Sequence, residues 1–359
     1  MKRFPRFWSI VTLLFCLPLT ARADAGTPLM WAGLLHLVLG NAVIGIFEGT
    51  VLAWLFKLKT RNCILAMIPA NYFSAWIGGV FLNYEITTRV PFDLYNAWHW
   101  IWAMVLVTFL LTLVLEWPFV RFCFRGSPDG LKRSLWGNLA VNSLSYALLF
   151  AWYWLASGTT LHTKMNVVRP PGITFPQGGT VYFISETNGV CTFDFSSRRT
   201  QEVYPLTTDR DDRLFLQASA SNTNNWDILD STGKILVSSN LPVLATTWWR
   251  DNPPNSIEGT EFNFGEAAQL AAGSDWNFRT GFWPIEGFRG INKHTGEQFH
   301  FSLETPFVSW TARNATHLPG DYVVFQLGEN QICLFETATK KVALLARGQG
   351  PVVVLPRKS

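Results

Sequence analysis

Hydrophobic positions are concentrated in the first ~155 residues, where they form four long stretches. These stretches cover about 30–56, 64–82, 98–115 and 135–155. Each approaches or exceeds the roughly 20 residues that a helix needs to cross the hydrocarbon core of a bilayer. After residue ~170 the pattern changes to short alternating segments bounded by turn residues, which is typical of antiparallel β structure. The pattern predicts a four-helix transmembrane domain over 24–156, a linker over 157–169 and an all-β domain over 170–359.

The first 23 residues have the layout of a secretory signal peptide. Lys2 and Arg3 precede a short apolar segment, and the small residues Ala21 and Ala23 come before a cleavage point at Asp24. An uncleaved membrane anchor over 1–23 is the alternative. Under either interpretation, the segment after Asp24 begins outside the cytoplasm.

Basic residues predict which side of the membrane each loop occupies. The loop 83–97 has only Arg89 against Glu85 and Asp93. The other two loops contain seven basic residues: Lys57, Lys59, Arg61, Arg121, Arg125, Lys132 and Arg133. Loops rich in Lys and Arg stay in the cytoplasm. We therefore expect a multi-pass protein of the plasma (inner) membrane, with the β domain outside the cytoplasm, in the periplasm or at the cell exterior.

Two acidic residues lie within the predicted spans, and polar companions recur around them. Glu48 is in the first stretch and Glu116 ends the third, and each precedes a basic residue by nine positions. Asn and Ser, three positions apart, recur in the second and fourth stretches. With Asn41 on the Glu48 face, the set is Glu48, Asn71, Ser74, Glu116, Asn142, Ser145 and Asn41. The recurrence predicts that the domain is a duplicated helical hairpin.

Helix geometry brings these polar residues to a similar depth. A rise of 1.5 Å per residue puts Glu48 about 13 Å, and Asn71 and Asn142 about 10 Å, from the cytoplasmic ends of their helices. An acidic residue inside a membrane is a functional-site hypothesis because its charge is costly there. The functional interpretations are a proton relay, an ion path or a catalytic carboxyl pair. The alternative is structural: Asn and Ser form hydrogen bonds between helices, and each Glu is protonated or paired with its Asn. Gly45 and Gly49 have the GxxxG spacing that lets a second helix approach closely.

Two segments of the β domain align without gaps at an offset of 142 residues. Residues 178–199 read GGTVYFISETNGVCTFDFSSRR, and residues 320–341 read GDYVVFQLGENQICLFETATKK. Weaker copies lie around 213–234 and 288–297, each ending in a polar turn such as Ser-Thr-Gly-Lys. The region resembles the loosely defined blades of bacterial propeller domains. That resemblance implies a β-propeller-like fold of four or five blades and no particular ligand. An irregular β-sandwich is the alternative.

The aligned segments place two cysteines at equivalent positions. Cys191 and Cys333 are the only cysteines expected outside the cytoplasm in the mature chain. Equivalent positions in the first and last repeats would be neighbours in a closed ring, so a Cys191–Cys333 disulfide is a hypothesis. It requires Cα atoms within about 7 Å of each other. Two buried thiols at equivalent core positions are the alternative.

Sequence motifs of common enzymes are missing from the chain. It contains no GxSxG elbow, P-loop, dinucleotide fingerprint or HExxH. The turn at Thr295 and Gly296 separates His294, Glu297 and His300, and the acidic loop 209–212 is typical of a solvated turn, so we expect no metal site. One loop combines aromatic and polar residues and is a candidate contact for a sugar or a peptide, with packing under a long loop as the alternative. It comprises Trp248, Trp249, Arg250 and Asp251.

Charge argues against nucleic acid as a partner. The formal net charge of +4 includes four basic residues of the predicted signal peptide, and 4 − 4 leaves a mature chain at 0. Residues 157–359 hold 17 basic and 19 acidic side chains, a balance of −2. Nucleic-acid binding relies on a basic surface that neutralises phosphates, and this domain offers no such excess.

These observations together favour a non-enzymatic envelope protein without a cofactor. The lipid bilayer is one partner, and we expect the β domain to bind an envelope protein or a glycan while the helices anchor or relay that event. A small transporter or channel component that uses Glu48, Glu116, Asn71 and Asn142 is the first alternative. An envelope-assembly factor that acts on lipid or exported protein is the second.

Overall fold

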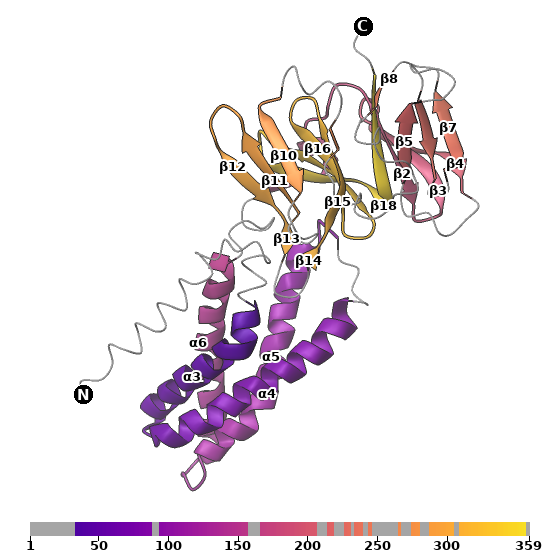
Figure 1. Ribbon diagram of the computed structural model, residues 1–359. Helices are drawn as coiled ribbons and strands as arrows, with labels where there is room; N and C mark the ends of the chain where they lie inside the picture. The colour runs from indigo at the N-terminus through magenta and orange to yellow at the C-terminus, as the bar shows by residue number, and fades with distance from the viewer. Residues whose placement is uncertain are drawn as a thin grey trace. The chain divides into compact units, whose positions relative to one another are not determined.

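The structure is a computed structural model that describes residues 33–87, 93–156, 166–206, 214–218, 226–230, 233–239, 243–245, 265–266, 274–280, 287–304 and 309–356. The chain divides into two compact units, here called the helical unit and the β unit (Figure 1). The predicted signal peptide (1–23), the acidic loop 209–212 and the loop of Trp248 to Asp251 lie outside the described residues, as does most of the predicted linker.

Four long α-helices build the helical unit. They are α3 (Asn41–Phe56), which a short π-helix at His36–Gly40 precedes, α4 (Thr60–Thr87), α5 (Ala97–Cys123) and α6 (Gly130–Ala156). Among the described residues, three segments are long and apolar enough to cross a membrane: Gly33–Phe56, Ala97–Cys123 and Gly130–Ala156. The predicted spans are thus confirmed as candidate membrane helices in three places. α4 is not in that group.

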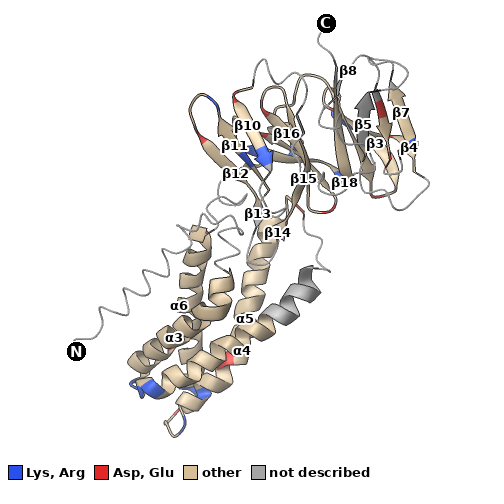
Figure 2. Cartoon of the chain, viewed as in Figure 1, with Lys and Arg blue, Asp and Glu red and all other residues tan. Residues whose placement is uncertain are grey.

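Charged residues of the helical unit gather at one end of the helices. Figure 2 shows Lys and Arg where α3 joins α4 and where α5 joins α6. By contrast, Glu48 and Glu116 are the only acidic residues of α3 and α5. Both side chains are only 1% exposed. Their burial within helices that are otherwise mostly apolar is the unusual feature of this unit.

α3 and α4 approach each other most closely at Gly45 and Gly49. A Cβ atom added at Gly45 would lie 2.6 Å from the Ile68 Cα, and one added at Gly49 would lie 2.6 Å from the Ile64 Cα. Only glycine therefore fits at these two positions, as the GxxxG spacing predicts. The close crossing brings Glu48, which directly precedes Gly49, against α4.

The close crossing predicts that Gly49→Val destabilises the helical unit. The added side chain would overlap the α4 backbone, and overpacking of this kind costs about 1–3 kcal/mol. Gly78 of α4 provides a matched control, because no described atom lies within 4 Å of its added Cβ. Thermal unfolding of the purified full-length protein in detergent should show a lower midpoint for Gly49→Val and little change for Gly78→Val. Equal midpoints for the two variants would contradict the close helix crossing.

β-Strands form nearly all of the regular structure in the C-terminal part of the chain. A single turn of 3₁₀-helix covers Pro170–Gly172. The strands are β1 (Asn166–Val167), β2 (Thr180–Ser185), β3 (Gly189–Asp194), β4 (Arg199–Pro205), β5 (Phe215–Ala218), β6 (Trp226–Leu229), β7 (Ile235–Ser239), β8 (Val243–Ala245), β9 (Gly265–Glu266), β10 (Trp276–Thr280), β11 (Phe288–Asn292), β12 (Gln298–Phe301), β13 (Leu303–Glu304), β14 (Ser309–Trp310), β15 (Ala312–Leu318), β16 (Tyr322–Leu327), β17 (Gln331–Glu336) and β18 (Lys341–Pro356).

These strands pair mainly antiparallel. A 10-stranded sheet follows the order β4-β3-β2-β18-β17-β16-β15-β9, with β1 and β8 paired to β18. Separate three-stranded sheets are β5-β6-β7 and β10-β11-β12, and β13 pairs with β14. The prediction of a large all-β region is therefore confirmed. The described strands do not close into a barrel or a ring.

The two aligned sequence segments adopt matching backbones. Adding 142 to the bounds of β2 and β3 gives the bounds of β16 and β17. Val181 pairs with Phe193, and correspondingly Val323 pairs with Phe335. Both segments also change register at the same point, just before Cys191 in one and just before Cys333 in the other. The sequence offset thus corresponds to the same strand pairing.

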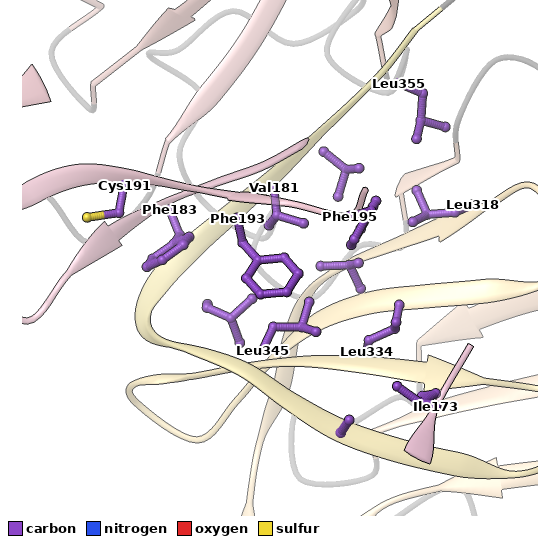
Figure 3. Packing of buried hydrophobic residues seen from close by; sticks show 14 residues of the cluster. Ile173, Val181, Phe183, Cys191, Phe193, Phe195, Leu318, Leu334, Leu345 and Leu355 are labelled. Atoms are coloured by element: carbon purple, nitrogen blue, oxygen red, sulfur yellow. The ribbon is translucent and has the colours of Figure 1, made fainter. Parts of the chain in front are cut away.

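The 10-stranded sheet has two halves, β15–β18 and β2–β4, which are each called a sheet from here on. Three hydrophobic clusters lie between these two halves and the sheets β10-β11-β12 and β5-β6-β7, four sheets in all. The first lies between β10-β11-β12 and one face of β16 and β17, and includes Phe288 and Phe325. The second lies between the opposite face of β17 and the β2-β3 hairpin, where Figure 3 shows Phe183 and Phe193 near Leu334 and Leu345. The third joins the other face of β2 and β3 to β6 and β7. Each sheet therefore packs face to face on its neighbour.

β18 is the longest strand and takes part in two of these sheets. Its first half pairs with β17 up to Arg347, and its second half pairs with β2 from Gly348 onward. The buried Gln326 side chain fixes the change of direction, because its amide oxygen accepts the Gly350 N–H at 2.8 Å. Gly350 has φ of +60°, a conformation that glycine adopts without strain. One strand thus joins the last sheet to the first.

The hypothesis of a Cys191–Cys333 disulfide is wrong in this structure. Both thiols are free. Cys191 lies in the cluster between β17 and the β2-β3 hairpin, whereas Cys333 points to the opposite face of β17. Equivalent positions of two repeated sheets point in the same direction. When such sheets stack face to face, the cysteines at these positions lie on different sides of a sheet and cannot meet. Burial raises the pKa of both thiols, which keeps them in the unreactive protonated form.

A short segment between α4 and α5 belongs to the β unit. The segment is Asp93–Tyr95. Leu94 is 2% exposed and packs in the cluster around Phe325, and its N–H donates to the Gln331 side chain at 2.7 Å. Asp93 forms an ion pair with Arg347 at 2.7 Å. The chain therefore contributes a piece of the β core before it enters α5.

Tyr95 strengthens this attachment by bonding both the N–H and the carbonyl of Leu344. Its hydroxyl accepts the Leu344 N–H at 3.2 Å and donates to the Leu344 carbonyl at 3.4 Å. Leu344 lies beside the register change between β17 and β18. Burial raises the pKa of the Tyr95 phenol, so its hydroxyl stays protonated and keeps both bonds at neutral pH.

Candidate functional site: a buried carboxyl pair

Glu48 lies at the centre of the polar cluster in the helical unit. The Asn71 amide of α4 donates to Glu48 Oε2 at 2.5 Å and also to the Met67 carbonyl at 3.0 Å. Ser145 of α6 lies beside the same carboxyl group on another side. Glu48 therefore contacts polar residues from two other helices.

Glu116 has the mirrored arrangement. The Ser74 hydroxyl of α4 donates to Glu116 Oε1 at 2.6 Å, and Asn142 of α6 lies beside the carboxyl group. The two carboxyl groups are close enough to interact electrostatically. Each Glu thus has the Asn of its own predicted hairpin and the Ser of the other hairpin as neighbours. The structure brings together six of the seven residues that the sequence singles out.

Asn41, the seventh residue, is buried but lies apart from this arrangement. Its amide donates to the Leu37 carbonyl of the preceding helical turn at 3.2 Å. No hydrogen bond from Asn41 to another helix occurs among the described residues. Its position on the Glu48 face at a spacing of seven follows from helix periodicity, which does not by itself create a contact.

The hydrogen bonding of the two carboxyl groups is incomplete. Glu48 Oε1 and Glu116 Oε2 are buried and have no hydrogen-bond partner among the described residues. The described basic residues of this unit lie at the helix ends and in the connections between helices, and none of them forms an ion pair with either Glu. Buried polar atoms are normally hydrogen-bonded, so each exception calls for an explanation. Helix-to-helix hydrogen bonding explains only one oxygen of each carboxyl group.

A second line of polar residues extends from this pair along α5 and α6. Asn142 donates to Asn138 at 3.1 Å, and Asn138 donates to the Leu113 carbonyl of α5 at 2.8 Å. The Thr112 and Tyr146 hydroxyls are 2.9 Å apart. Sequence reasoning missed Asn138, Thr112 and Tyr146. The signal was present, because polar residues repeat every four positions along both helices: Thr108, Thr112 and Glu116, and Asn138, Asn142 and Tyr146.

The small polar face of α6 accommodates the cluster. The buried residues of its first four turns include Ser134, Gly137, Asn138, Val141, Asn142 and Ser145. An added Cβ at Gly137 would lie 2.8 Å from the Leu52 side chain of α3. Small side chains here let α3, α5 and α6 pack around the carboxyl groups without a bulky apolar layer between them.

The β unit contains one further polar cluster that the sequence did not predict. His317 Nε2 contacts Asp321 Oδ1 at 2.9 Å and the Ser274 hydroxyl at 3.4 Å, and Ser274 also bonds Asp321. Although burial opposes it, hydrogen bonds from His317 and Ser274 hold the pKa of Asp321 below its ordinary value. A catalytic triad uses opposite nitrogens of the His ring for Ser and Asp. Here one nitrogen faces both, so we interpret the cluster as a structural turn.

Residues considered for metal binding are engaged in pairs on the surface. His294 lies 3.3 Å from Asp275, and Glu297 lies 2.9 Å from Lys340. No group of three or more His, Cys, Asp or Glu residues suited to a metal ion occurs in the described part of the chain. The proposed ligand loop of Trp248 to Asp251 lies outside that part, so its geometry adds nothing here.

No family model, curated protein or solved structure matches this chain.

The hydrogen bond from Asn71 predicts that Asn71→Leu destabilises the helical unit. The change removes the donor to Glu48 Oε2, at a cost on the order of 1–2 kcal/mol. Asn41→Leu is the matched control, because Asn41 bonds only the Leu37 carbonyl of the preceding helical turn. Thermal unfolding of the full-length protein in detergent should show a clearly larger loss for Asn71→Leu. A larger loss for Asn41→Leu would overturn the assigned pairing.

Proposed function

We propose that this protein is a multi-pass envelope membrane protein whose β unit binds a protein or a glycan outside the cytoplasm. The helices would anchor that module and receive the effect of binding through Asp93–Tyr95. One observation carries the proposal: a loop between two membrane helices supplies a buried residue, Leu94, to the β core. A module that was merely tethered by its linker would not need this second attachment.

The same observation supports the proposed topology. Residues 93–95 can belong to the β unit only if the α4–α5 loop and the β unit lie on one side of the membrane. At 28 residues, α4 is about 42 Å long at 1.5 Å per residue, more than the roughly 30 Å of hydrocarbon. We propose that α4 spans the membrane in addition to the three candidate spans. The seven basic residues at the α3–α4 and α5–α6 connections then lie on the side away from the β unit. That side is the cytoplasmic side by the positive-inside rule. The predicted signal peptide fits this orientation.

The stacking of the sheets supports a propeller-like architecture for the binding module. In space the sheets follow the order β10-β12, β15-β18, β2-β4 and β5-β7. This is a cyclic rotation of their order along the chain, as in a ring of consecutive blades. The second half of β18 completes the first sheet as a fourth strand. We propose that the aligned segments are repeated blades and that Trp248 to Asp251 is the ligand loop.

Cysteine accessibility tests the orientation. Ser196 is exposed in the β unit and Lys59 is exposed in the α3–α4 connection. A membrane-impermeant maleimide added to spheroplasts should label Ser196→Cys but not Lys59→Cys, in a background with Cys123→Ala. After the membrane is permeabilised, both should react. Labelling of Lys59→Cys alone in intact spheroplasts would reverse the proposed topology.

Complementation of a deletion strain tests the functional proposal. We expect a chain truncated after residue 164 to fail, because it lacks the binding module. The double variant Leu94→Ala, Tyr95→Phe keeps both units but loses the attachment, and we expect a clear loss of function at normal expression. Val203→Ala, a change at an exposed position of the β unit, is the control.

The outcomes of that experiment separate the parts of the proposal. Full complementation by the truncated chain would show that the β unit is dispensable and would overturn the binding role. Failure of the truncated chain with full activity of the double variant would keep the binding role and remove the relay through Asp93–Tyr95.

A further inference from the structure

We propose that Glu48 and Glu116 together form a proton-binding site that holds one exchangeable proton for the pair. This site goes beyond the binding role proposed for the β unit. It assigns a ligand, the proton, to a buried cluster that neither anchoring nor glycan or protein binding would require.

Charge is the first argument for this site. Both carboxyl groups are 1% exposed and lie within helices expected to cross a membrane. No described Lys or Arg forms an ion pair with either group, so two ionised carboxylates would be two uncompensated charges away from water. Such burial is so costly that buried acids take up a proton instead. At least one of the two groups is therefore protonated.

Hydrogen bonding is the second and independent argument. Asn71 and Ser74 each donate to one carboxylate oxygen, and the remaining oxygens, Glu48 Oε1 and Glu116 Oε2, have no described partner. Ionised carboxylate oxygens are acceptors only, so they cannot bond each other. One proton on either carboxyl group converts one of these oxygens into a donor.

The surroundings of the pair contain few competing titratable groups. Tyr146 of α6 lies near both carboxyl groups and bonds Thr112. The residues that α4 presents to the pair are Asn71 and Ser74, which do not titrate. The facing residues of α6 are Asn142, Ser145 and Tyr146. The proton therefore has the two carboxyl groups as its acceptors, in line with carboxyl dyads that titrate as a pair.

A groove lined by the π-helix, α3 and α6 ends at a neighbour of the pair. It encloses about 100 Å³ and is lined by apolar residues together with His36 and Ser145. Ser145 also lies beside Glu48, although neither carboxyl group lines the groove itself. The His36 ring of the π-helix bonds the Tyr153 hydroxyl of α6 at 2.7 Å. We expect a small apolar reagent dissolved in the bilayer to approach Glu48 through this groove.

Labelling with dicyclohexylcarbodiimide tests the site directly. The reagent adds to a protonated carboxyl group, and the adduct rearranges to a stable N-acylurea without a leaving group. With the full-length protein in nanodiscs, mass spectrometry should find the adduct at Glu48 or Glu116 at neutral pH. The exposed Glu297, which is paired with Lys340, should remain unlabelled. Labelling should decline as the pH rises.

The shape of the pH dependence tests the sharing of the proton. Wild-type labelling should follow a broader curve than a single group, because the two carboxyl groups titrate as a coupled pair. Glu48→Gln and Glu116→Gln should each give a single-site curve at the remaining Glu. A single-site curve for the wild type would overturn sharing, and no labelling of either Glu at any pH would overturn the site. Should the Gln variants fail to fold, the wild-type curve still decides.

Sodium competition and a blocked groove complete the test. Replacing N-methylglucamine with sodium at constant pH should leave the labelling unchanged, whereas protection by sodium would assign the pair to a metal cation and overturn the proton. Ile44→Trp should fill the groove and slow labelling several-fold. Leu110→Trp, at an exposed position of α5 outside the groove, should label at the wild-type rate. These measurements need no phenotype, so their outcome is independent of the complementation result.

Discussion

Burial of two carboxyl groups away from water is the constraint around which the helical unit is arranged. Hydrogen-bond donors must come from neighbouring helices, because the helix that carries each Glu satisfies only its own backbone. Asn71 and Ser74 of α4 supply one donor to each carboxyl group. They reach that position because Gly45 and Gly49 let α3 and α4 touch, and because the buried face of α6 is small and polar. The close packing of the helices is therefore what places the hydrogen-bond donors beside the carboxyl groups.

The β unit meets a different requirement, which is to cover flat sheets on both faces. Each of the three clusters is shared by two sheets, so no sheet forms a core by itself. β18 joins the last sheet to the first, and Leu94 fills part of a cluster from outside the strands. The polar contacts of Gln326 and Tyr95 lie where strands bend or change register, which satisfies backbone groups that regular pairing leaves free.

Sequence patterns predicted the parts whose signals are local. Hydrophobic stretches gave three of the helices that can cross a membrane, and the 142-residue offset predicted two segments with matching strand pairs. Recurrence of Glu, Asn and Ser identified residues that meet in space. It did not reveal that Glu116 bonds Ser74 of the other hairpin, nor that Tyr146 lies nearby, because those contacts depend on how helices cross. The disulfide prediction failed for the same reason: the stacking of the sheets decides which face a cysteine meets.

The path of β18 has a consequence for how this chain is made. β2 is among the first strands of the β unit to leave the ribosome, yet its partner on one edge is residues 348–354, far later in the sequence. The edge of β2 therefore waits, unpaired, until those residues have been synthesised. Such long-range pairing is intrinsically slow and exposes strands to wrong partners. Folding of this part runs against the direction of synthesis, so a chain that lacks residues 348–354 loses the edge pairing of β2 although the first half of β18 can still pair with β17.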